Sequence, residues 1–149
     1  MSHSHTKIWI HLIFGTKERT PLIDEKFEKL LYIRINDKLK TEYNSLVYAI
    51  NGTKDHIHIL FLQNSNFSLS DIVKNIKGES SHWINQNNFI DKKFAWQSGY
   101  GAFSISDTKE DKIIEYIKNQ KEHHKKISFV EEYNLFLKKY GFNSLLENR

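Results

Sequence analysis

The feature that most constrains the fold is a run of alternating residues from Leu46 to Leu62, interrupted once by Asn51-Gly52. The run is rich in Ile, Val, Tyr and Phe, and an Asn-Gly pair accepts the positive φ angles of a tight turn. It therefore predicts two β-strands joined as a hairpin. Successive side chains on a strand point to opposite faces, so His56 and His58 share one face, about 7 Å apart along the strand.

Two histidines placed in this way allow two interpretations. Their imidazoles can hold one metal ion between them and leave most of its coordination sphere open. A half-exposed sheet face also accommodates two polar residues without any ligand. The pair alone leaves both interpretations open, and the choice depends on the rest of the chain.

The residues around the hairpin predict the other elements of a mixed sheet. Alternation predicts a strand over residues 7–14, in which His11 is a surface or packed histidine rather than a ligand. Apolar residues at helical spacing predict helices over residues 24–41 and 69–83, and residues 94–106 predict a strand in two pieces around 98–101. The order β-α-β-β-α-β indicates an α+β fold, a ferredoxin-like split βαβ antiparallel sheet with its helices on one face.

The caps of these two helices can be assigned from the sequence. Asp24 is expected to cap the first helix, and either Ser68 or Ser70 the second. Gly78 lies inside the second helix and weakens its predicted continuity.

Two more helices are expected after the sheet. Asp107 and Glu110 have the spacing of a capping box, which predicts a helix from Asp107 to about Lys126. Tyr116 and Gln120 are four residues apart on it, so they lie on one face about 6 Å apart along the axis. A short final helix is predicted from Phe129 to Tyr140, ending at Gly141.

His123 and His124 lie near the end of the helix that carries Tyr116. Together with the neighbouring lysines they form a cationic last turn, which suits the helix dipole. We favour this structural role over phosphate binding.

The composition is that of one ordinary globular domain, which we draw over residues 1–149 with a disordered stretch at 1–5. Of the 149 residues, 39% are hydrophobic and 27% are charged, and there is no cysteine. The lack of cysteine excludes disulfides, thiolate metal sites and a cysteine nucleophile. No apolar run approaches the length of a membrane span and the N-terminus lacks a signal-peptide core, so we expect a cytoplasmic protein with no membrane contact.

The charge balance favours a nucleic-acid partner. The formal net charge is +4 and the pI is about 9.1. Lysine supplies most of the excess, because the only arginines are Arg19, Arg34 and Arg149. Lysine acts as a point charge, which suits a phosphate backbone better than the bidentate reading of bases.

Three stretches together resemble the single-tyrosine HUH transposases, which small bacterial insertion sequences of the 200/605 type (IS200-like) encode. They are Asp55–Leu60 (DHIHIL), Trp96–Phe103 (WQSGYGAF) and Tyr116–Gln120 (YIKNQ), and Phe14–Arg19 is similar to the family's first strand and loop. The resemblance spans about residues 7–142. Many relatives have a proline before the Asp of the first stretch, where this chain has Lys54; this difference affects the turn but not the ligands.

The resemblance implies a role for each motif residue. His56 and His58 would be metal ligands, Gln120 the third ligand, and Tyr116 the nucleophile. Two imidazoles and an amide oxygen suit Mg²⁺ or Mn²⁺, which can polarise a scissile phosphate. Attack by Tyr116 would leave a 5′-phosphotyrosine and a free 3′-OH, and attack by a 3′-OH would rejoin the strand without ATP.

The resemblance also implies partners. The substrate would be single-stranded DNA with hairpins at the ends of the element. The protein would be a homodimer in which the tyrosine helix of one subunit completes the metal site of the other. Basic residues that could contact the DNA are Lys17, Arg19, Lys74 and Lys77.

Other enzyme classes with histidine motifs fit less well. A histidine-triad hydrolase needs H-x-H-x-H, and position 60 is Leu. A two-histidine phosphoesterase needs two H-x-Ser/Thr motifs, and His58 occupies the position of the hydroxyl. Relaxases and replication initiators share the H-x-H chemistry, but their chains are usually larger and many place the tyrosine elsewhere.

Two alternatives to a mobile-element enzyme stay open. A domesticated relative that processes palindromic repeats would keep the same active residues. A non-catalytic module that binds single-stranded nucleic acid would need stacking aromatics on the strand that His56 and His58 occupy. We therefore expect a DNA transposase that cuts and rejoins single-stranded DNA through Tyr116.

Overall fold

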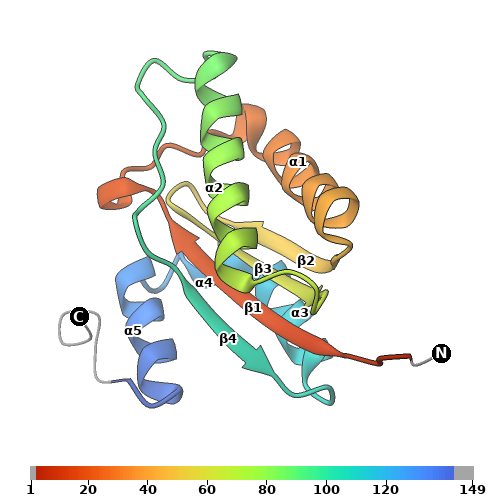
Figure 1. Cartoon of the computed structure of the whole chain (residues 1–149). Helices are drawn as coiled ribbons and strands as arrows, with labels where there is room; N and C mark the ends of the chain where they lie inside the picture. Colours follow the sequence, from red (N-terminus) through yellow and green to blue (C-terminus); the bar gives the residue numbers. More distant parts are fainter. Residues whose placement is uncertain (1–2, 143–149) are drawn as a thin grey trace.

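The computed structural model describes residues 3–142, in which four strands form one sheet (Figure 1). The strands are β1 (Ile8–Gly15), β2 (Leu46–Gly52), β3 (His56–Gln63) and β4 (Gly101–Ile105), in the order β2-β3-β1-β4. Every neighbouring pair is antiparallel. β3 thus lies between the parallel strands β1 and β2, which confirms the predicted ferredoxin-like topology.

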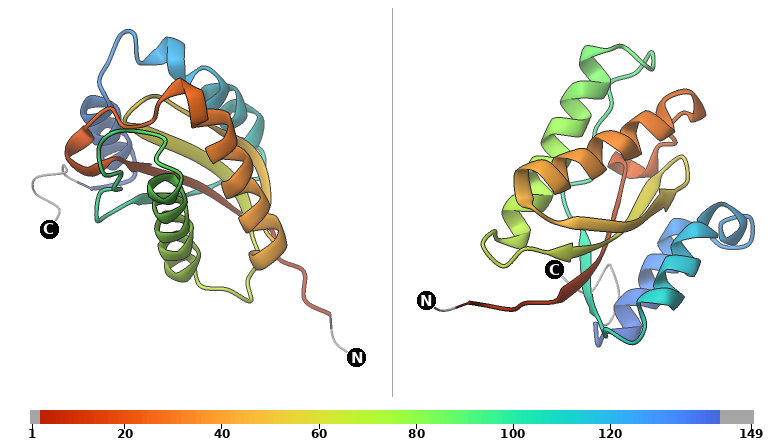
Figure 2. Two further views of the ribbon diagram at one scale, coloured as in Figure 1. Left: turned by 90° about the horizontal axis from the view of Figure 1, so that it is seen from above. Right: turned by 90° about the vertical axis from the view of Figure 1, so that its right-hand side faces the viewer.

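Helices cover both faces of this sheet (Figure 2). The helices α1 (Glu25–Tyr43) and α2 (Leu69–Gln86) share one face. On the other face lie α3 (Glu110–Lys118) and α5 (Phe129–Lys139), which the short α4 (Gln120–His123) connects along the chain. A single turn of 3-10 helix, η1 (Lys17–Arg19), follows β1.

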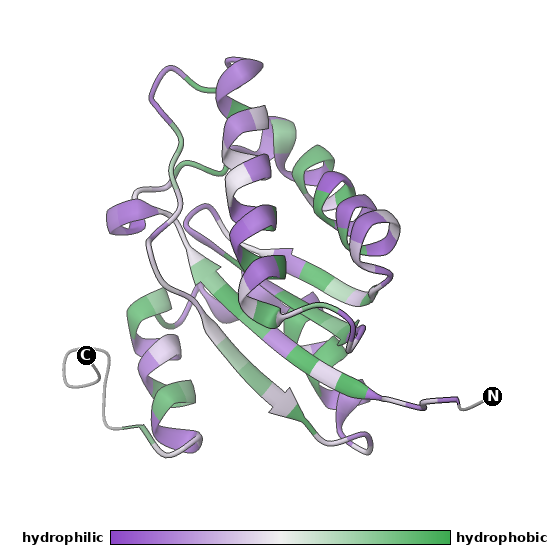
Figure 3. Cartoon of the chain, in the orientation of Figure 1, coloured by the Kyte–Doolittle hydropathy of each residue, from purple (hydrophilic) through white to green (hydrophobic). Residues whose placement is uncertain are grey.

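Alternation along the central strands gives the sheet buried hydrophobic side chains on both faces. β1 is mostly hydrophobic along its length (Figure 3). Phe14 and Phe61 pack toward α1 and α2. Ile13 packs with residues of α5, and Leu60 packs with Ile117 of α3. Because both faces are covered, polar side chains on the second face, which a half-exposed sheet would leave in water, are fully buried.

Local capping follows the sequence closely. The Asp24 side chain accepts a hydrogen bond from the backbone N–H of Lys26, and Ser68 accepts one from Asp71, so both predicted caps are confirmed. The helix α2 runs unbroken through Gly78. A full capping box lies at α5, where Ser128 and Glu131 bond reciprocally.

The predicted hairpin turn at Asn51-Gly52 is wrong by two residues. β2 continues through Gly52, and the chain turns over residues 53–55 instead. The Asn51 side chain donates to the carbonyls of Ile117 and Lys118, which ties β2 to the end of α3. A Cβ at position 52 would lie 2.1 Å from the His56 carbonyl oxygen, so glycine is needed here for space and not for a positive φ.

The predicted single helix from Asp107 to Lys126 is also wrong. Asp107 does not cap it: its carboxylate accepts a hydrogen bond from the Trp9 indole at 2.8 Å and pairs with Lys7 at 2.9 Å. The helix α3 begins at Glu110 without a side-chain cap, and the backbone leaves helical geometry at Asn119 before the short α4.

The predicted strand over residues 94–106 is confirmed only in its second piece, β4. The first piece makes a single bridge, between Thr16 and Trp96. Two of its polar groups bond to α2: the Phe94 N–H donates to the Asn85 side chain, and the Trp96 indole donates to Ser80.

The predicted disordered stretch lies partly outside the described residues, and residues 3–5 form neither helix nor strand. Within residues 3–142 no helix combines the length and the apolar character needed to cross a bilayer.

Candidate active site

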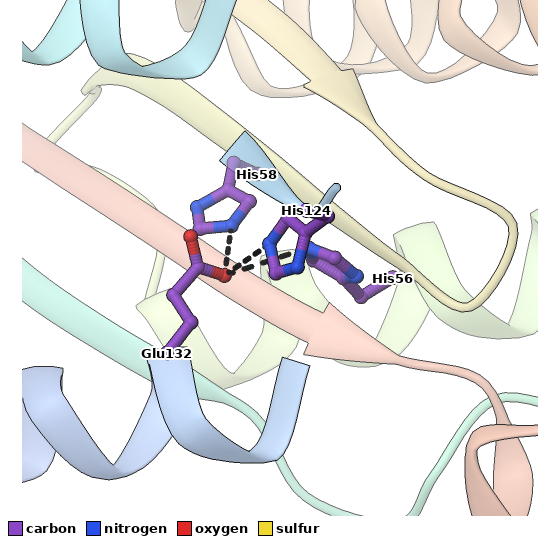
Figure 4. A group of neighbouring side chains, drawn as sticks. All are labelled: His56, His58, His124 and Glu132. Atoms are coloured by element: carbon purple, nitrogen blue, oxygen red, sulfur yellow. Dashed lines mark hydrogen bonds and ion pairs between the residues drawn. The ribbon is translucent and has the colours of Figure 1, made fainter. Parts of the chain in front are cut away.

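Four side chains from three parts of the chain converge on the second face of the sheet (Figure 4). His56 and His58 come from β3, His124 follows α4, and Glu132 comes from α5. Their ligand atoms all lie within 4.8 Å of one another. His56, His58 and Glu132 are buried and His124 is partly buried, so the group is enclosed between the sheet and α5.

The Glu132 carboxylate connects every residue that the sequence predicts for the site. Its Oε1 lies 2.9 Å from His58 Nε2, 3.0 Å from His124 Nε2 and 3.5 Å from His56 Nε2. Its Oε2 accepts hydrogen bonds from the Tyr116 hydroxyl and, at 3.0 Å, from Gln120 Nε2. One carboxylate therefore bridges the predicted nucleophile and the predicted ligands.

Gln120 is the first residue of α4, directly after the break at Asn119. It is fully buried, and its Oε1 lies 3.1 Å from His56 Nε2. The Tyr116 ring lies 5.8 Å from the His58 ring, measured between centroids. The structure thus brings together His56, His58, Gln120 and Tyr116 within one chain.

The far nitrogens of the two β3 histidines are also engaged. His56 Nδ1 lies 2.7 Å from Asp55 Oδ1 and 3.0 Å from Thr53 Oγ1. His58 Nδ1 lies 2.9 Å from Nε2 of His11, which is packed as predicted and fully buried. Such partners fix ring orientation, and a carboxylate behind an imidazole is a common support for a metal ligand. Both Nε2 atoms consequently point to the centre of the site.

The charges of the site are set by burial and by Glu132. Burial alone would raise the pKa of Glu132, but hydrogen bonds from His124, His56 and His58 outweigh it and hold that pKa far below its usual range. Burial lowers the pKa of His58 to about 4 despite the nearby carboxylate. At His56 burial is outweighed by the Asp55 and Glu132 carboxylates, which raise the pKa. Glu132 is therefore ionised and His58 is neutral near pH 7.

The Tyr116 phenol is held protonated in this arrangement. Burial raises its pKa most, and the hydrogen bond to the Glu132 carboxylate and its negative charge raise it further. The hydroxyl also lies 3.4 Å from His123 Nε2. The phenolic proton therefore has a carboxylate oxygen as its acceptor before any substrate binds.

The donor atoms fit a divalent cation. Imidazole nitrogens, a carboxylate oxygen and the Gln120 amide oxygen face one point, and a buried anion near them offsets the charge of a bound ion. Oxygen donors suit Mg²⁺ and Mn²⁺, whereas imidazole also suits heavier transition metals. The donor set supports a metal centre, and it does not select one ion.

His124 and Glu132 were missed in the sequence as members of this site. The signal for Glu132 was a charged residue within the apolar stripe of the final helix, three residues after Phe129 and four before Phe136. His124 had no comparable signal, because a histidine among lysines at a helix end has an ordinary explanation in the helix dipole.

The four basic residues predicted to contact DNA lie away from this centre. Lys17 and Arg19 are exposed on η1, and Lys74 is exposed on α2. The Lys77 ammonium donates to the carbonyls of Gln97 and Gly99. Nothing in the described residues tests DNA contact, so these assignments stay predictions.

Comparison with known proteins gives two solved structures of similar fold. One is described as a "putative transposase" from Deinococcus radiodurans R1, with 23% identity and a TM-score of 0.62 over 80% of this chain and 98% of that one. The other is a REP-associated tyrosine transposase bound to a REP hairpin, with 18% identity and a TM-score of 0.60 over 83% of this chain and 74% of that one. A search of curated proteins found no match.

The sequence itself also matches a known protein family. The family described as "Transposase IS200 like" matches residues 4–120, which include the H-x-H pair, Tyr116 and Gln120. The chain belongs to the IS200-like transposase family.

Proposed function

We propose that this transposase cuts and rejoins single-stranded DNA at hairpin-marked ends through a covalent 5′-phosphotyrosine at Tyr116. The observation that carries the proposal is the hydrogen-bonded group in which Glu132 joins Tyr116 to His56, His58 and Gln120. A phenol that shares one carboxylate with three imidazoles is placed for nucleophilic chemistry next to a cation site.

The cleavage step uses atoms that are already in contact. The Tyr116 oxygen attacks the scissile phosphorus and forms a P–O bond while the bond to the 3′-oxygen breaks. The phenolic proton has Glu132 Oε2 as its acceptor, and the departing 3′-oxygen takes up a proton to become the 3′-OH. The energy of the phosphodiester stays in the tyrosine ester, so a 3′-OH can reverse the step.

The proposed metal ligands are His56, His58 and Gln120, with His124 and Glu132 as further donors. A bound Mg²⁺ or Mn²⁺ would supply charge stabilisation for the phosphate oxygens. The His56–Asp55 and His58–His11 contacts orient the two β3 imidazoles so that their Nε2 atoms face the proposed metal position.

A covalent-adduct assay tests the proposal. Single-stranded oligonucleotides with the hairpins that flank the gene are incubated with the protein and Mg²⁺ or Mn²⁺, then resolved on a denaturing gel. We expect a protein–DNA band that requires metal and disappears in Tyr116→Phe and in His58→Ala.

The control variant is Tyr48→Phe, which changes an exposed tyrosine on β2 and should keep the band. Circular dichroism of each variant separates loss of chemistry from loss of folding. Hairpin binding with no covalent band under either metal would favour a non-catalytic binding module and contradict the enzyme.

We propose further that the active form is a homodimer whose metal sites are completed in trans. In a single chain Tyr116 already lies beside the histidines, so a mixing experiment is needed to test the exchange. Tyr116→Phe and His58→Ala are inactive separately; their mixture should regain the covalent band if the tyrosine helices are exchanged. A mixture that stays inactive would mean that Tyr116 acts on the site of its own chain.

A further inference from the structure

Tyr116 is one of the residues that line a surface pocket. The pocket is a cavity of about 360 Å³ lined by residues of α3 and α5, and both helices lie on the second face of the sheet (Figure 2). Tyr116, His123 and Glu132 are among its lining residues. The Tyr116 hydroxyl contacts the other two, His123 and Glu132, so the predicted nucleophile belongs to a hydrogen-bonded group in the pocket wall.

The rim of this pocket is cationic. Lys112 of α3 and Lys139 of α5 line it, and both are exposed. Among the described residues, no carboxylate forms an ion pair with either of them; the lysine ion pairs near the site are those of Lys121 with Glu28 and of Lys125 with Glu122. The Lys139 ammonium rests 5.7 Å above the Tyr140 ring, beside the pocket. Two unpaired ammonium groups at a nucleophile suit a phosphodiester chain.

The remaining lining is apolar. Ile113, Leu135 and Phe136 contribute to it, and Leu135 is 61% exposed. A single strand of DNA presents bases and sugars beside each phosphate, and exposed apolar side chains bind those groups without regard to sequence. The pocket therefore combines the two kinds of contact that a single strand needs.

We propose that this pocket binds the backbone of single-stranded DNA next to the scissile phosphate, with Lys112 and Lys139 contacting phosphates and Leu135 contacting a base or sugar. This rests on the proposed function for the role of Tyr116. It assigns the strand to the groove between α3 and α5, away from Lys17, Arg19 and Lys74; in the exchanged dimer proposed above, the α3 that lines each groove would come from the partner subunit.

Salt-dependent binding tests the two lysines. The probe is a fluorescein-labelled dT20 oligonucleotide without metal, measured by anisotropy between 50 and 200 mM salt, which spans about the range where such effects are large. Each phosphate contact with a single strand contributes about 0.7 to the slope of log K against log salt. For Lys112→Gln/Lys139→Gln we expect the slope to fall by about 1.4 and affinity at 0.1 M salt to fall about 25-fold.

The matched control removes the same charge from the opposite face. Lys29→Gln/Lys40→Gln changes two exposed lysines of α1, and it should leave the slope nearly as in the wild type. Equal losses in both double variants would mean that dT20 responds only to net charge, and that result would overturn the pocket as a binding site.

A crosslinking experiment locates the strand directly, because the natural chain has no cysteine. Leu135→Cys carries a benzophenone at the pocket rim, and Leu30→Cys carries one at a 50%-exposed position on α1. We expect light to join dT20 to the first variant and not to the second. Absence of the Leu135→Cys crosslink, or a protein–protein crosslink that forms in its place, would contradict the proposal; the latter would indicate a second copy of the chain.

The outcome is independent of the cleavage assay. Neither anisotropy nor crosslinking needs Tyr116 to react, so a missing covalent band with an intact lysine effect would reject the chemistry and keep the pocket. A covalent band without any effect of the lysine substitutions would support the chemistry and reject the pocket as the binding site.

Discussion

Among single residues, Glu132 has the largest electrostatic role, because its carboxylate is the negative charge that the histidines of the site share. It is buried and ionised, and four imidazoles lie around it: those of His56, His58 and His124 near Oε1, and that of His123 near Oε2. The Tyr116 hydroxyl and the Gln120 amide also donate to Oε2. Removing one partner of a buried charge group leaves the others unpaired, which is usually costly. We expect Glu132→Gln to lower the free energy of unfolding at pH 7 by about 2–4 kcal/mol, measured by urea denaturation.

The pH dependence of that difference has a defined sign. Because the folded-state pKa of Glu132 is lowered, its contribution is fully present above the unfolded-state pKa of about 4.3 and is lost as the pH falls further. The difference in stability between wild type and Glu132→Gln should therefore begin to narrow below about pH 5 and keep narrowing through pH 3, because the folded-state pKa lies far lower still. The control is Glu115→Gln, an exposed carboxylate of α3; a difference that stayed constant down to pH 3 would refute the assignment.

Within the secondary-structure elements, replacing Gly52 or Gly78 by alanine is expected to change the stability in opposite directions. A Cβ at Gly52 would meet the backbone of β3 at 2.1 Å, so Gly52→Ala must shift the strand that carries His56. A Cβ at Gly78, inside α2, would meet nothing within 4 Å. By thermal and urea denaturation we expect Gly52→Ala to destabilise by about 1–3 kcal/mol and Gly78→Ala to stabilise by about 0.5–1 kcal/mol.

The elements that could be predicted from the sequence are those fixed by local patterns. Alternation gave the faces of His56 and His58 correctly, and the caps at Asp24 and Ser68 follow from local hydrogen bonds. The failures depended on contacts distant in sequence. Asp107 does not cap the helix, because its carboxylate accepts a hydrogen bond from Trp9, which is 98 residues away in the sequence. Glu132 contacts His58, which is 74 residues away. Residue spacing within one helix carries no information about such partners.

In the whole molecule, the candidate metal site lies between the sheet and the helices that cover its second face. The sheet contributes two imidazoles, and the segment from α4 to α5 contributes His124 and Glu132. A ligand that binds only the folded state stabilises it by about 2.7 kcal/mol at 100 times its dissociation constant. We expect Mn²⁺ to raise the melting temperature and His124→Ala to reduce that increase, measured by scanning fluorimetry.

The control for this metal effect is His82→Ala, which changes a histidine of α2 on the opposite side of the sheet. It should keep the full increase in melting temperature. An increase of equal size in His124→Ala and wild type would mean that Mn²⁺ binds elsewhere.

The most direct test of the central claim is to locate the DNA on the protein. After reaction with a hairpin oligonucleotide and Mn²⁺, the protein is digested with nuclease and protease, and its peptides are analysed by mass spectrometry. We expect a nucleotide attached through phosphate to Tyr116, on a peptide that is unmodified when EDTA is present. A nucleotide on another residue, or none on Tyr116 while the DNA is cut, would contradict it.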